Sequence, residues 1–124
     1  MRPAIDIARA FDLPARSRGV RFLVDRLWPR GIRKEDLAVD GWLKAVAPST
    51  ALRQWFGHDP ARWSRFQQRY EAELSAHPEA WQPILEAARK EPVTLVYAAR
   101  DLEHNHARVL CAFLKRRLPR HPLA

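Results

Sequence analysis

The sequence of 124 residues predicts a single α/β domain, 1–124, in which a small, mostly parallel sheet of about three strands is covered by several helices. Two runs rich in β-branched and aromatic residues, 20–24 and 93–98, have the composition of strands. A shorter apolar stretch at 5–8 can supply the third strand. Several other stretches repeat apolar residues every three to four positions, which is typical of helices.

In the N-terminal half, the strand 5–8 is followed by a loop at 12–19, which contains Pro14 and Gly19. In the strand 20–24 we expect the side chains to alternate, and one face then carries Val20, Phe22 and Val24. A helical turn is predicted at 35–38 and a short helix after Asp40, carrying Trp42, Leu43 and Val46. Ser49 or Thr50 can cap a further short helix that ends at Gly57.

The C-terminal half begins with a strong helix start, Asp59 followed by Pro60. Apolar residues then recur at helical spacing and should face the core: Trp63, Phe66, Tyr70 and Leu74. Pro78 begins another helix, in which Pro83 is awkward. After the strand 93–98, the last helix is expected from about Glu103 to Leu118.

Charge and cysteine content restrict the class of protein. The chain carries 22 Lys and Arg against 14 Asp and Glu, which gives a net charge of +8. This basic balance makes a nucleic-acid-binding or regulatory module an alternative, with the dense run 115–117 and Arg120 as the contact surface. Cys111 is the one cysteine, so no internal disulfide forms, and with no membrane-spanning run or signal-like start we expect a cytoplasmic protein.

Two polar clusters follow the two best strands. The segment 25–31 comes directly after the strand 20–24, and the segment 100–106 comes after the strand 93–98. Ligands of open α/β sheets bind beyond the carboxyl ends of the strands. We therefore expect the clusters to meet in one pocket for an anion.

In the second cluster we expect Asp101 to cap a helix whose free amide groups favour an anion, with Arg100 as a bidentate donor. His104 and His106 would diverge by about 200° on a helix, so one of them at most would face the pocket as a general acid or base. A metal pair is not expected. Asn105 either donates to the ligand or caps the helix.

In the first cluster, Arg26 or Arg30 would reach the ligand, while Asp25 orients an arginine or accepts a proton. The alternative is an Asp–Arg ion pair that only fixes the loop. Trp28 either stacks on a flat ligand or belongs to the core. A third stretch, 48–60, is expected to form a wall of the site. In it, Ser49 and Thr50 either contact the anion or serve as helix caps, and His58 is not expected to be catalytic.

These motifs together resemble the DUF488 family, in its short YeaO-like branch. The resemblance rests on the segments 23–31, 47–50, 52–53, 55–58, 97–101 and 105–107, and it extends from about Ile5 to Leu118. It implies a compact α/β domain with these motifs near the strand ends. It does not imply a reaction, since the function of the family is unknown.

The sequence also lacks several familiar catalytic signatures: the Gly-x-Ser-x-Gly elbow, the P-loop, the Gly-x-Gly-x-x-Gly loop and zinc-type cysteine spacing. The favoured hypothesis is a protein that binds a small phosphate- or nucleotide-like anion, without a cofactor or a membrane. Whether it also acts on the ligand is left open, with Asp25, His104 and His106 as the candidate catalytic residues. A scaffold that binds a protein partner is a third hypothesis, and the oligomeric state is not predicted.

Overall fold

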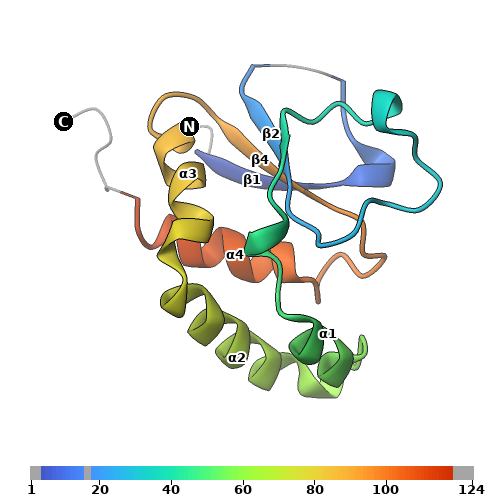
Figure 1. Cartoon of the computed structure of the whole chain (residues 1–124), viewed down its shortest axis with the longest axis vertical. Coiled ribbons are helices and arrows are strands. Elements are labelled where there is room, and N and C mark those ends of the chain that lie inside the picture. The colour runs from blue at the N-terminus through green and yellow to red at the C-terminus, as the bar shows by residue number, and fades with distance from the viewer. Residues whose placement is uncertain (1–3, 16–17, 119–124) are drawn as a thin grey trace.

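The computed structural model describes residues 4–15 and 18–118 and contains a four-stranded sheet in the order β1-β4-β2-β3 (Figure 1). The strands are β1 Ile5–Arg9, β2 Val20–Leu23, β3 Gly41–Trp42 and β4 Val93–Tyr97, and every pairing between them is parallel. The α/β fold class is therefore confirmed. The sheet has one strand more than the three expected from the sequence.

The four α-helices lie together on one side of the sheet (Figure 1). They are α1 Thr50–Phe56, α2 Trp63–Ala76, α3 Pro78–Ala88 and α4 His106–Lys115. The predicted apolar stripe of α2 is confirmed, because Phe66, Tyr70 and Leu74 are all buried in the main core. Among the helices of the described chain, none has the length and apolarity that a membrane span requires.

The other face of the sheet is covered by irregular segments instead of α-helices. Leu23 and Val96 form a second, smaller core there with the loop residues Trp28 and Leu37. The ring of Trp28 meets Trp42 edge-on, with centroids 5.3 Å apart, and its Nε1 donates to Ile32 O at 2.6 Å. Trp28 is therefore half-buried and packed against this smaller core. The predicted alternation of side chains along β2 is confirmed, because Leu23 lies in the smaller core whereas Val20, Phe22 and Val24 pack in the main core.

The helix predicted after Asp40 is wrong. The chain there forms β3, which pairs with β2, and only a 3-10 turn at Lys44–Val46 follows. Close packing explains why the strand begins on a glycine: a Cβ at Gly41 would lie 3.2 Å from the Phe22 ring. The indole Nε1 of Trp42 donates to Asp25 O at 2.7 Å, which holds the end of β2 against this edge.

The start of the last helix also differs from the prediction. The cap of α4 is Asn105, whose side chain accepts from Arg108 N at 3.1 Å, so the helix begins at His106 and not near Glu103. Asp101 instead caps the preceding turn, where its Oδ1 accepts from the amides of Glu103 and His104 at 2.9 Å. Asp and Asn are both good N-caps, and here the cap of α4 is Asn105, which is only 2% exposed.

Candidate functional site

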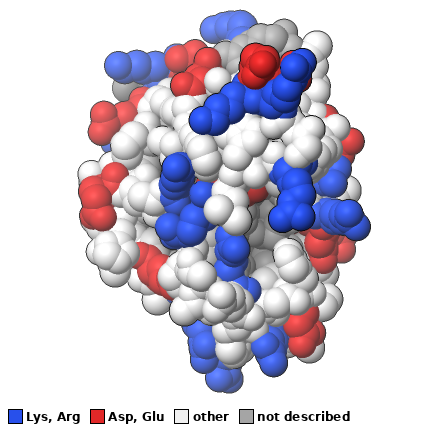
Figure 2. All heavy atoms as spheres, turned by 45° about the vertical axis from the view of Figure 1, so that its right-hand side comes forward, with Lys and Arg blue, Asp and Glu red and all other residues white. Residues whose placement is uncertain are grey.

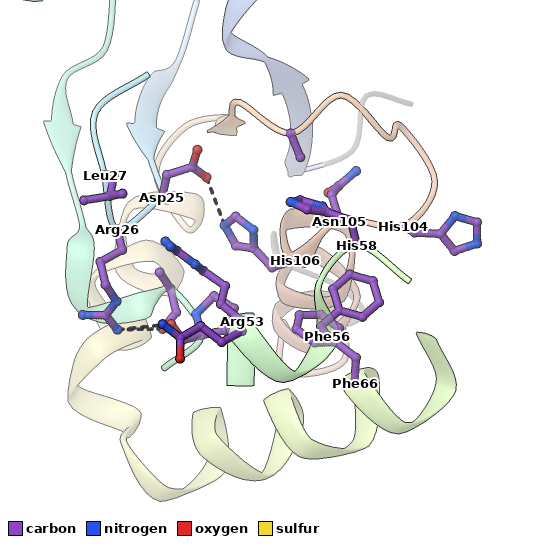
Figure 3. Close-up of a pocket in the computed structure, with 14 residues that line it drawn as sticks. Asp25, Arg26, Leu27, Arg53, Phe56, His58, Phe66, His104, Asn105 and His106 are labelled. Carbon is purple, nitrogen blue, oxygen red and sulfur yellow. Dashed lines mark hydrogen bonds and ion pairs between the residues drawn. The ribbon is translucent and has the colours of Figure 1, made fainter. Parts of the chain in front are cut away.

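A cavity of about 310 Å³ lies beyond the carboxyl ends of β2 and β4 (Figure 3). Three parts of the chain form it: the segment after β2, the region 47–66 around α1, and the loop that leads into α4. This is the edge of the sheet at which the sequence places a pocket. Its lining comprises Asp25, Arg26, Leu27, Ala47, Pro48, Arg53, Gln54, Phe56, His58, Phe66, Ala99, His104, Asn105 and His106.

Asp25 and His106 form a pair at one end of this cavity (Figure 3). Asp25 Oδ2 accepts from Ala98 N at 3.0 Å, and Oδ1 lies 3.1 Å from His106 Nε2. The same Nε2 lies 3.0 Å from Val24 O. A carbonyl only accepts, so Nε2 carries the proton and His106 is held in one tautomer. The pair thus ties the ends of β2 and β4 to the start of α4.

Arg26 lines the cavity without a carboxylate partner among residues 4–15 and 18–118. Its Nη2 donates weakly to Pro48 O at 3.2 Å and to Ala47 O at 3.4 Å. Its Nε is buried and makes no hydrogen bond in the described structure. The Asp–Arg ion pair that the sequence allowed is not what holds Asp25, whose partners are Ala98 and His106.

His104 and His106 both belong to the lining, but the His106 ring lies against Asp25 whereas the His104 ring extends away from that pair (Figure 3). The assumed divergence applies within a helix, and His104 lies before α4 begins. Its Nδ1 contacts Asp101 Oδ2 at 2.9 Å, and its ring meets Trp63 edge-on at 5.2 Å. The pKa of the Asp101 carboxyl group is lowered, mainly because it accepts hydrogen bonds from the backbone amides of His104 and, next in size, Glu103.

The other predicted site residues lie elsewhere. Arg30 and Arg100 are exposed and outside the cavity lining. Ser49 caps α1, accepting from Leu52 N at 3.1 Å, and its Oγ donates to Glu73 at 2.6 Å. Thr50 is exposed in the first turn of α1. In the described part of the chain, no three metal-binding side chains come together.

The stretch 48–60, expected as a wall of the site, does contribute to the lining, but the sequence did not single out Arg53 or His58 within it as site residues. Arg53 lies on α1, and among the described residues its guanidinium has no ion-pair partner. His58 follows Gly57, the left-handed C-cap of α1, and itself has φ of 59°. Glycine signalled the end of α1 in the sequence, but the positive φ that turns His58 back to the cavity is unusual for a non-glycine residue and had no sequence signal.

The basic run near the C-terminus is partly engaged within the fold. Arg116 pairs with Glu71 at 3.1 Å, and the Arg117 guanidinium lies 3.5 Å from the centroid of the Phe113 ring. Arg120 lies outside the described residues. On the face drawn in Figure 2, several Lys and Arg side chains surround a central hollow, while Asp and Glu lie mostly toward the periphery.

Comparison with known proteins agrees with the resemblance found in the sequence. The family model described as "Inactive DUF488-N3 subclade" matches residues 4–122. The uncharacterized protein YeaO of Escherichia coli K12 is 43% identical over 111 residues, which cover 90% of this chain and 96% of YeaO. The uncharacterized protein Rv3073c of Mycobacterium tuberculosis H37Rv is 40% identical over 113 residues, covering 91% of this chain and 95% of the relative. No solved structure gives a significant match. The chain therefore belongs to the DUF488 family, in the subclade described as inactive.

Proposed function

We propose that this protein binds a small phosphate- or nucleotide-like anion in the cavity at the carboxyl ends of β2 and β4. One observation carries the proposal: Arg26 and Arg53 both line the cavity, and neither has a carboxylate partner among the described residues. Guanidinium groups bind phosphate and carboxylate oxygens with short, charge-assisted hydrogen bonds.

The energetics of Arg26 support a ligand at this place. A buried donor without a partner costs about 1–3 kcal/mol, and more when the group is charged. The buried Nε of Arg26 is such a donor, and an anion oxygen would satisfy it. The single carboxylate in the lining is that of Asp25, so the two arginines leave an excess of positive charge.

Binding without turnover is the form of the proposal that the subclade's description favours. Asp25 and His106 are the best placed of the candidate catalytic residues, yet both are hydrogen-bonded to the backbone of neighbouring strands. Those bonds give the two side chains a positioning role that needs no chemistry. The ring of His104 is held instead by the carboxylate of Asp101.

Thermal unfolding in the presence of inorganic phosphate and of adenosine monophosphate tests the proposal. A ligand at about 100 times its Kd stabilises the folded state by about 2.7 kcal/mol, which raises Tm by several degrees. Arg26→Gln and Arg53→Gln should each weaken binding at least tenfold. Arg65→Gln removes the same charge from an exposed position on α2 outside the cavity and should retain the effect. Equal Tm shifts in all three variants would refute the proposal.

A further inference from the structure

We infer that the ligand of this cavity is a nucleoside monophosphate, whose phosphate contacts Arg26 and Arg53 and whose base donates a hydrogen bond to Asp25. The inference rests on the proposed function and adds the class of molecule. It follows from a second unsatisfied group in the cavity wall, from the placement of Asp25 relative to Arg26, and from the apolar residues of the lining.

The second unsatisfied group is an acceptor. Asp25 Oδ1 is buried and receives no well-aligned hydrogen bond in the described structure, although His106 Nε2 is 3.1 Å away. The reason is that the ring has one proton on Nε2 and this proton also serves Val24 O at 3.0 Å. The Asp25 side chain is only 15% exposed, so bulk water satisfies it poorly. A ligand with an N–H or O–H group would supply the missing donor.

The acceptor and the Arg26 guanidinium do not lie together. In Figure 3 the Asp25 carboxylate is joined to His106, whereas the neighbouring Arg26 side chain extends away from that pair. A bare phosphate beside Arg26 leaves Asp25 unsatisfied, and a phosphate beside Asp25 is repelled by its charge. The ligand that satisfies both ends carries its anion at one end and a hydrogen-bond donor at the other.

Several of the other lining residues are apolar. Leu27, Pro48 and Phe56 are among them, and Phe56 is stacked on Phe66 with centroids 4.5 Å apart. Such walls suit a flat ring with apolar faces and polar edges better than a polyhydroxylated chain. The cavity of about 310 Å³ is at the small end of ligand sites, which favours a single nucleotide over a polymer.

Isothermal titration of the full-length protein tests this inference with inorganic phosphate, ribose 5-phosphate and the four nucleoside monophosphates. At least one nucleotide should bind at least tenfold more tightly than ribose 5-phosphate. Asp25→Asn should remove that gain, because the amide can still accept from Ala98 N but presents a donor where Oδ1 accepts. The same substitution should not weaken binding of inorganic phosphate, because it removes a negative charge from the site.

A second measurement keeps the inference testable if Asp25→Asn does not fold. Methylation of the N–H on the favoured base should reduce its affinity for the wild-type protein to that of ribose 5-phosphate. If phosphate binds and no base adds affinity, the inference is overturned but the proposed function stands. The hydrogen-bond partner of Asp25 Oδ1 would then be a water molecule. A gain that survives Asp25→Asn or base methylation would also overturn the inference. Failure of every anion to bind would remove both proposals.

Discussion

Tyr70 offers a test of the packing beneath the site, because its hydroxyl group is buried with one partner. The residue has no exposed surface, and its hydroxyl donates to Val46 O at 2.6 Å. Burial raises the pKa of this phenol well above its usual value of 10, the carboxylates of Glu73 and Asp25 raise it further, and Arg26 opposes them. The folded protein therefore keeps Tyr70 protonated at a pH where the unfolded chain ionises it.

The sign and size of the effect follow from proton linkage. Above pH 10 the unfolded state binds fewer protons than the folded state, so stability falls as pH rises, by up to about 1.4 kcal/mol per pH unit. At pH 11 the loss due to Tyr70 is about 1.4 kcal/mol. Tyr70→Phe removes this loss, but it leaves the buried Val46 carbonyl unpaired, which costs about 1–3 kcal/mol at neutral pH.

Urea unfolding of the wild type and of Tyr70→Phe between pH 7 and pH 11 measures both terms. We expect the variant to be less stable at pH 7 and the difference to shrink by about 1.4 kcal/mol at pH 11. Phe66→Leu is a suitable control, because it truncates another buried ring of α2 that does not titrate and its cost should be the same at every pH. A constant difference for Tyr70→Phe across this range would refute the reasoning.

Three further predictions concern other parts of the chain. Burial raises the pKa of the Cys111 thiol, so Ellman's reagent should react with it at least tenfold faster in denaturant than in the folded protein, and equal rates would contradict this. Ser49→Ala removes the cap of α1 and the hydroxyl group that donates to Glu73, so the free energy of unfolding in urea should fall by about 1–3 kcal/mol. Thr50→Ala is the control and should change this free energy by less than about 0.5 kcal/mol. Pro83→Ala restores an amide donor inside α3 and should raise the free energy of unfolding by about 1–3 kcal/mol. Pro78→Ala, at the first position of the helix, is the control and should not raise it. A loss of stability in Pro83→Ala would count against this account.

The parts of the fold that were predictable are those with long periodic patterns. The alternation along β2 and the apolar spacing of α2 each involve several residues, and both core faces follow from them. The strand β3 has two residues, which is too short for any periodicity, so its apolar neighbours were mistaken for a helix. Its pairing with β2 is a tertiary contact that no local pattern records.

The location of the site was predictable from the sequence, but the full set of residues that line it was not. The two clusters follow strands that are neighbours in the sheet, so Asp25, Arg26, His104 and His106 do line one cavity. The stretch 48–60 was expected as a wall of the site, but Arg53 was not singled out in it, because an arginine on a short helix looks like any other charged surface residue. Arg30 and Arg100 were predicted as site residues because they belong to the same two clusters, but their side chains are exposed and outside the lining.

The description of this subclade as inactive and the presence of Asp25, His106 and Arg26 in its cavity are compatible for a physical reason. Asp25 and His106 connect β2, β4 and α4 through hydrogen bonds to Ala98 N and Val24 O, so the fold needs them whether or not a reaction occurs. Arg26 is different, because its Nε satisfies no group in the described structure and its loss would remove a buried, unpaired donor. The Nη2 of Arg26 does donate weakly to the Ala47 and Pro48 carbonyls, but its buried Nε has no such role, and under our proposal the ligand supplies the partner of that Nε. Arg26 is therefore the residue whose substitution separates binding from stability in this cavity.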